Sequence, residues 1–230
     1  MKKLSIIIPT YNEEQTIINI LQRINDTKSN DINYEIIVID DCSKDGTVAL
    51  LEQNKSLFTK LIKNEINLGK GGAVKVGISN VSGDYIIFQD ADLEYDPIDI
   101  KKFVDVFLKF NADIILGSRF SYDKYTKSHS FYNKIGNWVI TFIFNFLYNT
   151  TFTDIYCCYL CFRTNLIKGE QLKTNGFEQQ AEILSKIVSR SKNYYEVPVN
   201  YNGRTIAEGK KIRFYHIFYV IKEIILGKFR

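Results

Sequence analysis

The sequence predicts an α/β fold in which helices cover both faces of a mostly parallel sheet. In its first half, short and continuously apolar runs alternate with stretches of helical pattern, and apolar strands separated by helices are typical of parallel sheets buried on both faces. Polar residues follow several of these runs, at the strand ends where such sheets bind ligands. With 230 residues, 45% of them hydrophobic, and no linker or repeat, the chain is expected to form one domain, 1–230.

The first elements follow one another at short intervals. Leu4–Pro9 is an apolar run that predicts the first strand. Asn12 is placed to cap the helix that follows, because Glu13 and Glu14 would be favourable in its first turn. The elements expected next are a strand at Tyr34–Ile39, a helix at Asp45–Asn54, a short strand at Thr59–Lys63 and a helix at Ala73–Val81.

The most informative stretch is YIIFQDADLE, residues 85 to 94. Its apolar run, Tyr85–Phe88, predicts a buried strand that delivers Asp90 and Asp92 on the same side of the backbone if the extended geometry continues. Two adjacent carboxylates repel each other, and a hard cation between them removes the repulsion. Mg²⁺ or Mn²⁺ bound by a few carboxylates is the usual partner of a nucleotide diphosphate. A helix at Asp96–Phe110 and a strand at Asp113–Leu116 complete the first half.

Two further strand ends carry residues suited to a nucleoside. Pro9, Tyr11 and Glu13 supply a rigid turn, an aromatic face and a carboxylate. After the second strand, Asp40 or Asp41 would accept from ribose hydroxyls or a base N–H, as acidic residues do in dinucleotide sites. Each stretch also has a purely structural interpretation, a strand exit with a helix cap in the first and a capped turn in the second.

Three cationic positions suit phosphate. Lys70 lies in the glycine-rich run Asn67–Gly72, which lacks the spacing of a Walker loop, so a plain turn before a helix is the alternative to a diphosphate contact. Arg119 ends a strand, and its planar fork suits phosphate, with a surface salt bridge as the alternative. Arg204 belongs to a basic, glycine-containing loop that is either a mobile lid over an anion or a solvated segment.

The second half of the chain contains two aromatic and apolar segments. Trp138–Tyr148 and Phe214–Leu226 are shorter than the ~20 residues that a spanning helix needs. They suit amphipathic helices that lie in a membrane interface, pair with a second chain or belong to the core. No secretory signal follows Met1, and the four cysteines match neither a disulfide framework nor a zinc site, which favours a cytosolic location. A net charge of +4 is too small to indicate nucleic acid.

Four motifs occur here in the order seen in family-2 glycosyltransferases, whose GT-A fold contains a Rossmann-like sheet. They are P-x-Y-N-E from Pro9, D-D-x-S-x-D-G-T from Asp40, Q-D-A-D-L-E from Gln89 and G-S-R from Gly117. Others resemble the polyprenyl-phosphate branch, the dolichol-phosphate mannose synthase-like enzymes: I-G-N from Ile135, T-D from Thr153, F-E from Phe177 and E-V-P from Glu196. The resemblance covers nearly the whole chain, with 1–120 as the nucleotide-sugar half and 121–230 as the acceptor and membrane-interface half.

The resemblance implies a role for each candidate residue. The nucleotide sugar would be bound by Pro9, Tyr11, Glu13 and Asp41, with Asp40, Lys70 and Gln89 close by. The metal would be held by Asp90, Asp92 and Glu94, and phosphates would be contacted by Arg119 and Arg204. Asp154 would orient the acceptor or act as a base. The chain departs from many relatives in having Leu160 where they have lysine, and in stopping at Arg230 where they add membrane helices.

The expected reaction is inverting transfer of a hexose from a nucleotide diphosphate sugar, of the GDP-mannose or UDP-glucose type, to a polyprenyl phosphate. The metal and the arginines would offset the charge of two anions brought together, and the acceptor is already an oxyanion at neutral pH, so no base is required. The protein would act peripherally on the cytoplasmic face of the membrane, alone or with a membrane partner protein. Two alternatives stay open: transfer to a sugar hydroxyl of a glycan, with Asp154 as base, and a non-catalytic nucleotide-sugar-binding subunit.

Overall fold

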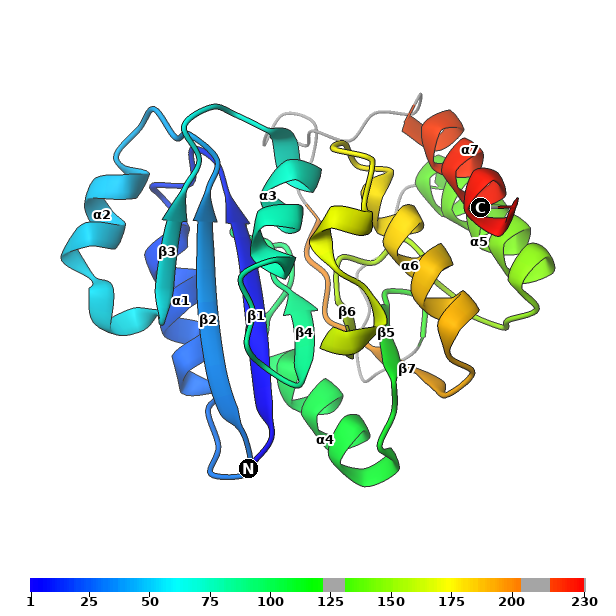
Figure 1. Ribbon diagram of the computed structural model, residues 1–230, viewed down its shortest axis with the longest axis horizontal. Helices are drawn as coiled ribbons and strands as arrows, with labels where there is room; N and C mark the ends of the chain where they lie inside the picture. Colours follow the sequence, from blue (N-terminus) through cyan, green and yellow to red (C-terminus); the bar gives the residue numbers. More distant parts are fainter. Residues whose placement is uncertain (122–130, 204–215, 230) are drawn as a thin grey trace.

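The computed structural model of the protein describes residues 1–121, 131–203 and 216–229. Its strands are β1 (Lys3–Thr10), β2 (Asn33–Asp40), β3 (Lys60–Lys63), β4 (Tyr85–Phe88), β5 (Ile114–Ser118), β6 (Leu160–Arg163) and β7 (Tyr194–Pro198). They form one sheet in the order β3-β2-β1-β4-β6-β5-β7 (Figure 1). Neighbouring strands are parallel except at β6, which runs antiparallel to both β4 and β5.

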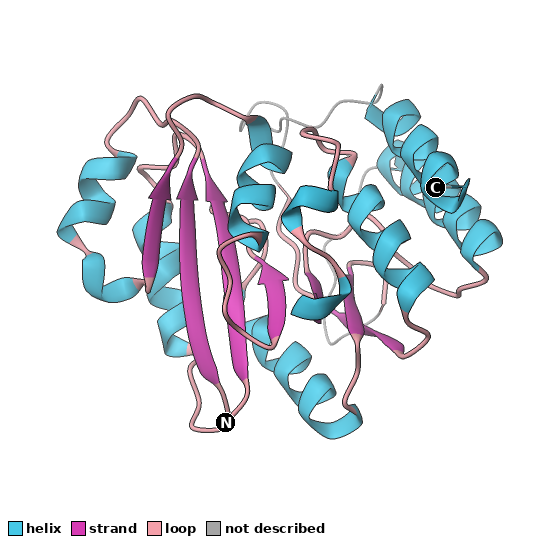
Figure 2. Ribbon diagram, in the orientation of Figure 1, coloured by secondary structure: helices cyan, strands magenta, loops and turns pink. Residues whose placement is uncertain are grey.

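Helices cover both faces of this sheet (Figure 2). They are α1 (Ile17–Asp26), α2 (Thr47–Gln53), α3 (Gly69–Ile78), α4 (Ile100–Phe110), α5 (Phe131–Tyr148), α6 (Gln179–Arg190) and α7 (His216–Phe229). Short 3₁₀ turns lie at η1 (Lys55–Leu57), η2 (Pro97–Asp99), η3 (Thr164–Leu166) and η4 (Gly169–Gln171). Helices α1 and α4 lie on one face and α3 and α6 on the other, while α5 and α7 pack against each other beside α6 (Figure 1). The predicted α/β fold with a mostly parallel sheet is confirmed.

The elements of the first half follow the predicted order, with shifted boundaries. Helix α1 begins at Ile17, and Asn12 does not cap it. Asn12 instead adopts a left-handed backbone with φ of 55°, and its side-chain oxygen accepts a hydrogen bond from the Lys44 N–H at 2.8 Å. The predicted cap is therefore wrong, because this side chain ties the β1 loop to the β2 loop at the ligand edge.

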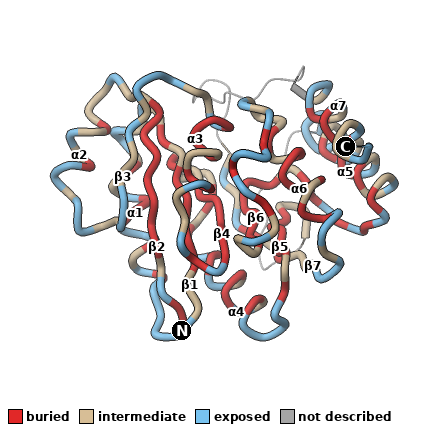
Figure 3. The backbone as a smooth tube through the Cα atoms, viewed as in Figure 1, coloured by how far each residue is buried: buried red, intermediate tan, exposed pale blue. Residues whose placement is uncertain are grey.

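The core consists of the central strands and the helix stripes that face them. In β1 the residues Leu4 to Ile8 are all buried, and α1 buries Ile17, Ile20, Leu21 and Ile24, the i, i+3, i+4, i+7 stripe of an amphipathic helix. Buried backbone concentrates in these strands and on the sheet-facing sides of the helices (Figure 3). The rigid sheet fixes the positions of the loops that extend beyond the strand ends.

Helices α5 and α7 present large apolar side chains to solvent. On α5, Trp138, Phe142 and Phe146 are 65%, 58% and 79% exposed, and on α7 Phe218 and Phe229 are 64% and 80% exposed. The two helices bury their other sides, since Phe144 and Ile224 are fully buried. Among the residues described here, no helix has the length and apolarity needed to cross a bilayer.

A buried carboxylate, Glu35, ties the N-terminal ends of β1 and β2 to the segment before β4. It accepts hydrogen bonds from the Ser5 hydroxyl (2.5 Å), the Ser82 hydroxyl and N–H (2.5 and 2.8 Å) and the Lys3 ammonium (3.0 Å). Burial alone would raise the pKa of Glu35, but these hydrogen bonds lower it from 4.5 to about 2. The carboxylate is therefore ionised in the folded protein at neutral pH.

Replacing Glu35 with glutamine is expected to lower the free energy of unfolding by about 2 kcal/mol at neutral pH. The folded pKa of Glu35 lies below the unfolded one, so its stabilisation is complete above about pH 4.5 and is lost as the pH falls toward 2. Urea unfolding of wild type and variant at several pH values should show the difference shrinking over that range. The exposed Glu170→Gln serves as control, and a pH-independent difference would contradict the ionic account.

Candidate active site

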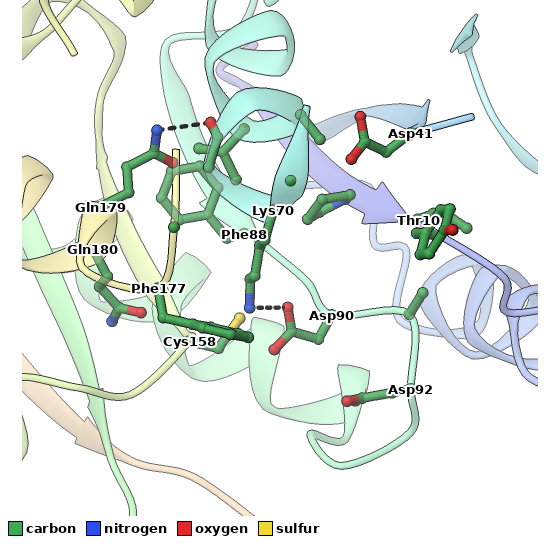
Figure 4. Close-up of a pocket in the computed structure, with 18 of the residues that line it drawn as sticks. Thr10, Asp41, Lys70, Phe88, Asp90, Asp92, Cys158, Phe177, Gln179 and Gln180 are labelled. Carbon is green, nitrogen blue, oxygen red and sulfur yellow. Dashed lines mark hydrogen bonds and ion pairs between the residues drawn. The ribbon is translucent and has the colours of Figure 1, made fainter. Parts of the chain in front are cut away.

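A cavity of about 470 Å³ opens at the carboxyl ends of β1, β2, β4 and β5, where the strand-end argument places a ligand. Nine of the predicted site residues line it: Pro9, Tyr11, Glu13, Asp41, Lys70, Asp90, Asp92, Glu94 and Arg119. Several of these point into it (Figure 4). Gln89, Asp40 and Asp154 lie behind its wall, and Arg204 lies outside the described residues.

At the β1–β2 end, the backbone of the Pro9–Glu13 loop is held by the neighbouring loop. The Glu13 N–H donates to the Thr47 hydroxyl at 2.9 Å, and the Glu13 carboxylate accepts from the Thr16 hydroxyl at 3.0 Å. Asp41 is 3% exposed, and its Oδ1 accepts from the Asn64 amide and the Leu68 N–H at 2.8 and 2.9 Å. Hydrogen bonds within the protein therefore hold both loops, and the same residues also form the cavity wall.

Two predicted residues, Asp40 and Gln89, do not line the cavity and instead form hydrogen bonds with nearby backbone groups. Asp40 is 2% exposed, and its Oδ2 accepts from the Ser43 N–H at 3.2 Å, while its Oδ1 has no hydrogen-bond partner among the described residues. Gln89 is fully buried, donates from Nε2 to the Asp90 carbonyl at 3.0 Å and accepts from the Tyr159 hydroxyl at 2.5 Å. Both hold the loops that carry Asp41 and Asp90, respectively.

Asp90 forms an ion pair at the centre of the cavity. The Lys70 ammonium, from the N-terminus of α3, lies 2.5 Å from Asp90 Oδ1 (Figure 4). Burial alone would lower the pKa of Lys70, but the Asp90 carboxylate raises it above its usual range. Burial also raises the pKa of the adjacent Cys158 thiol, which remains protonated. At neutral pH this part of the cavity therefore contains an ammonium and a carboxylate that neutralise each other.

The three carboxylates predicted to bind a metal are not gathered at one point. Asp92 Oδ1 accepts from the Glu94 N–H at 3.1 Å, and Glu94 Oε2 accepts from the Tyr201 hydroxyl at 2.8 Å. Across the described ranges, no three carboxylate, thiol or imidazole groups are close enough to form a metal-binding cluster. Asp90 and Asp92 nevertheless fit Mg²⁺ or Mn²⁺, because these cations commonly take one or two protein carboxylates and complete their shell with water and phosphate oxygens.

The glycines on either side of Lys70 are required by packing. A Cβ on Gly71 would lie 2.5 Å from the Asn175 carbonyl carbon, and the Gly71 N–H donates to the Asn175 carbonyl at 2.8 Å. Gln179, at the start of α6, donates from Nε2 to the Gly71 carbonyl at 2.7 Å. The close approach of Asn175 and Gln179 to the first turn of α3 explains Gly71 without a phosphate.

Arg119 stands at the opposite end of the cavity, held by a buried carboxylate. Its Nε and Nη2 donate to the two oxygens of Asp154 at 2.7 and 2.9 Å, and its backbone N–H donates to Asp154 Oδ2 at 3.1 Å. Nη2 also donates to the Tyr156 carbonyl at 3.0 Å. Burial alone would lower the pKa of Arg119, but Asp154 raises it well above its ordinary value. Within the described residues Nη1 donates to no acceptor, so this group remains to bind an anion.

Asp154 is in turn fixed by β7. Asp154 is fully buried, and the carboxylate of Glu196 accepts from the Thr153 N–H at 2.8 Å and from the Asp154 N–H at 3.2 Å. Burial raises the pKa of Glu196 despite these hydrogen bonds. The T-D and E-V-P motifs therefore meet in space, and both support the arginine.

Several side chains that line the cavity were not predicted as site residues, among them Tyr156, Gln180 and Tyr201. Tyr156 donates to the Phe177 carbonyl at 3.0 Å, and Gln180 donates to the Cys157 carbonyl. Tyr201 had a detectable signal, because it continues beyond β7 the alternation of the buried Val197 and Val199. The other two depend on how the segment before β6 and the start of α6 pack together, which no local pattern discloses.

The comparison with family models decides the classification. The model described as glycosyl transferase family 2 matches residues 5–169. The chain belongs to this family. The match begins in β1 and includes the three cavity aspartates, Asp41, Asp90 and Asp92, as well as Arg119 and Asp154, so the family region contains both ends of the site. The family resemblance drawn from the motifs is confirmed.

Relatives and solved structures extend this result. A Pyrococcus furiosus protein named dolichol-phosphate mannosyltransferase is 30% identical over 217 residues, which cover 90% of this chain and 59% of that protein. A Methanococcus voltae protein named UDP-N-acetylglucosamine–dolichyl-phosphate N-acetylglucosaminyltransferase is 28% identical over 250 residues, 99% of this chain and 98% of the relative. The chain thus spans less than two thirds of the first relative and nearly all of the second.

The fold is that of known glycosyltransferase structures. Glucosyl-3-phosphoglycerate synthase from Mycobacterium tuberculosis, in complex with UDP, superimposes with a TM-score of 0.70 at 15% identity, over 99% of this chain and 79% of that one. Residues 1–349 of TarS from S. aureus, in complex with UDP, give a TM-score of 0.65 at 20% identity, over 97% and 65% of the two chains. The expected GT-A fold is confirmed by these likenesses.

Proposed function

We propose that the protein transfers a hexose, with inversion, from a nucleotide diphosphate sugar to a polyprenyl phosphate. The observation that carries the proposal is a cavity lined both by a carboxylate pair after β4, Asp90 and Asp92, and by a largely buried arginine after β5, Arg119. Such a cavity suits two anionic groups that react with each other. The names of the Pyrococcus and Methanococcus relatives, which both include a dolichyl phosphate, support this pair of substrates.

On the donor side, Tyr11, Glu13 and Asp41 would bind the nucleoside, with the diphosphate directed toward Asp90 and Asp92. A divalent cation bound there supplies Lewis-acid stabilisation of the leaving diphosphate. Lys70 pairs with Asp90 in the free protein, and a diphosphate would offer its ammonium a second anionic partner. These residues would therefore neutralise the charge that develops as the sugar leaves.

On the acceptor side, Arg119 would bind the phosphate through its Nη1 group. A phosphate monoester is already an oxyanion at neutral pH, since its second pKa is near ~6, and can attack without a base. Asp154 is committed to Arg119 and is fully buried, which suits an orienting role. The geometry of this pair therefore favours phosphate over a sugar hydroxyl as the acceptor.

The lipid part of the acceptor would approach along α5 and α7. Their exposed aromatic side chains suit helices that lie in the interface of a bilayer. Asn137 of α5 accepts from Arg119 Nη2 at 3.4 Å, so the helix that would meet the lipid also contacts the phosphate-binding side chain. We place the protein peripherally on the cytoplasmic face of the membrane, where a nucleotide sugar is available.

A vesicle-binding experiment tests this surface. Replacing Trp138, Phe142 and Phe146 together by serine is expected to weaken binding to anionic phospholipid vesicles by about tenfold or more, because three exposed aromatic side chains no longer enter the interface. Co-sedimentation with vesicles measures the partitioning. Leu108→Ser, an exposed apolar position on α4, is the matched control. Unchanged binding of the triple variant would show that this face does not contact lipid.

A turnover panel tests the reaction itself. Purified protein with Mn²⁺ or Mg²⁺ is offered UDP-glucose, UDP-N-acetylglucosamine or GDP-mannose, with and without a short polyprenyl phosphate. We expect release of the nucleotide diphosphate with one donor, stimulated by the lipid. Release that depends on an added glycan would favour a hydroxyl acceptor, and donor binding without turnover would favour a non-catalytic subunit.

A further inference from the structure

Tyr201 contacts both ends of the cavity. Its hydroxyl donates to Glu94 Oε2 at 2.8 Å, in the loop that follows Asp90 and Asp92. The centre of its ring lies 5.2 Å from the guanidinium carbon of Arg119. A single side chain thus links the loop of the donor carboxylates to the cation of the acceptor end.

The backbone around Tyr201 is anchored to the same loop. Tyr201 forms an antiparallel bridge with Tyr95, and the Asn202 N–H donates to the Glu94 carbonyl at 2.8 Å. The rings of Tyr95 and Tyr201 are 4.9 Å apart. A Cβ on Gly203 would lie 2.6 Å from the Tyr201 ring, so the chain folds closely over this ring. The ring orientation is therefore fixed by packing on several sides and by the hydroxyl.

The ring in turn restricts Arg119. The Nε and Nη2 groups of Arg119 donate to Asp154, and Nη2 also donates to the Tyr156 carbonyl. These hydrogen bonds fix one edge of the guanidinium. The ring centres of Tyr201 and Phe120 lie 5.2 and 5.7 Å from the guanidinium carbon of Arg119, and the two rings restrict the tilt of the guanidinium plane. Because both the edge and the plane of the guanidinium are fixed, the direction of Nη1 is fixed as well.

We infer that Tyr201 is a positioning residue for the acceptor phosphate, which acts by holding Arg119 Nη1 toward the cavity, with Glu94 fixing the tyrosine. This inference rests on the proposed function for the identity of the anion. It separates two features of one side chain: the ring, which contacts the arginine, and the hydroxyl, which orients the ring. Each is removed by a different substitution.

The variants Tyr201→Leu and Tyr201→Phe are compared with wild type in steady-state kinetics. Loss of the ring in Tyr201→Leu is expected to raise KM for the polyprenyl phosphate by about tenfold, with less than about a twofold change in KM for the donor. Loss of the hydroxyl alone in Tyr201→Phe should raise the acceptor KM by about threefold. Tyr195→Leu, in β7 and outside the cavity, is the matched control and should behave as wild type.

Glu94→Gln distinguishes the hydrogen bond from the charge. The glutamine carbonyl still accepts from the Tyr201 hydroxyl, so the acceptor KM is expected to stay near the wild-type value even if kcat changes. Mn²⁺ binding, followed by electron paramagnetic resonance with the nucleoside diphosphate present, reports separately on any role of Glu94 at the metal. A purely structural tyrosine would raise both KM values together or lower only kcat, and either result overturns the inference.

A binding measurement separates this inference from the proposed function. Isothermal titration with a short, water-soluble prenyl phosphate needs no turnover, and Tyr201→Leu should weaken that binding by about tenfold while leaving nucleoside diphosphate binding unchanged. If wild type binds the prenyl phosphate but transfers no sugar to it, the proposed function is wrong. The role of Tyr201 is then still tested by whether Tyr201→Leu weakens this binding. Equal binding by wild type and Tyr201→Leu would overturn the role of Tyr201, whatever the reaction.

Discussion

Replacing Asp92 with asparagine is expected to lower kcat by about a thousandfold while the fold is retained. Asp92 lies in the cavity, and its Oδ1 accepts from the Glu94 N–H at 3.1 Å. The asparagine oxygen can accept the same hydrogen bond, so the loop keeps its shape. The negative charge is lost, and a neutral amide is a poor ligand for a hard divalent cation that must offset the charge of the leaving diphosphate.

Asp92 is a cleaner test than Asp90. Asp90 is paired with Lys70 at 2.5 Å, so its replacement would also leave the Lys70 ammonium without this partner. Steady-state turnover at saturating Mn²⁺ measures the effect of Asp92→Asn, and thermal unfolding checks the fold. Asp105→Asn, at an exposed position of α4, is the matched control. Wild-type kcat in the Asp92 variant would show that the Asp92 carboxylate is not needed to stabilise the leaving diphosphate.

The donor end of the site was predictable because it depends on local sequence. A strand signal followed directly by Asp90 and Asp92 fixes both their element and their place at the sheet edge, and the same holds for Asp41 after β2. Lys70 was predicted near a diphosphate from a glycine-rich run whose glycines in fact accommodate the backbone of Asn175. Lys70 lines the cavity, and its contact with a diphosphate stays a prediction.

The acceptor end depends on contacts that no local pattern contains. Strand β6 has only four residues, and its antiparallel pairing with β4 and β5 joins segments far apart in the sequence. Arg119 and Asp154 were both candidates, but their ion pair spans 35 positions of the chain and appears only in the folded structure. Tyr201 lies in the cavity because the segment after β7 packs against Glu94, to which the Tyr201 hydroxyl donates a hydrogen bond. Side-chain roles at this end follow from the topology.

The second large effect on turnover is expected for Asp154, which is interpreted from the sequence either as a base or as an orienting group. A general base must lie within hydrogen-bonding reach of the proton that it removes. Asp154 is fully buried, and both of its oxygens accept from Arg119, with the Tyr156 N–H as a further donor at 3.2 Å. We therefore expect Asp154 to act through Arg119.

Asp154→Asn is expected to lower turnover by about a hundredfold and the free energy of unfolding by about 3 kcal/mol, because it leaves the buried Arg119 without its counter-ion. Turnover and urea unfolding measure the two effects. Since a lost base would also lower turnover, the single variant does not distinguish the two roles. Arg119→Lys keeps the positive charge and removes the paired hydrogen bonds to Asp154, so it provides the second corner of a double-mutant cycle.

The double variant decides between the two roles. If Asp154 acts only by positioning Arg119, then Asp154→Asn adds little to the loss already caused by Arg119→Lys, and the coupling between the two positions accounts for most of the single-variant effect. If Asp154 removes a proton from the acceptor, the two losses multiply, and the rate of Arg119→Lys retains a pH dependence that the double variant lacks. Multiplying losses would favour a sugar hydroxyl as the acceptor. Losses that do not multiply would support a phosphate, whose oxygen is already ionised when it reaches Arg119.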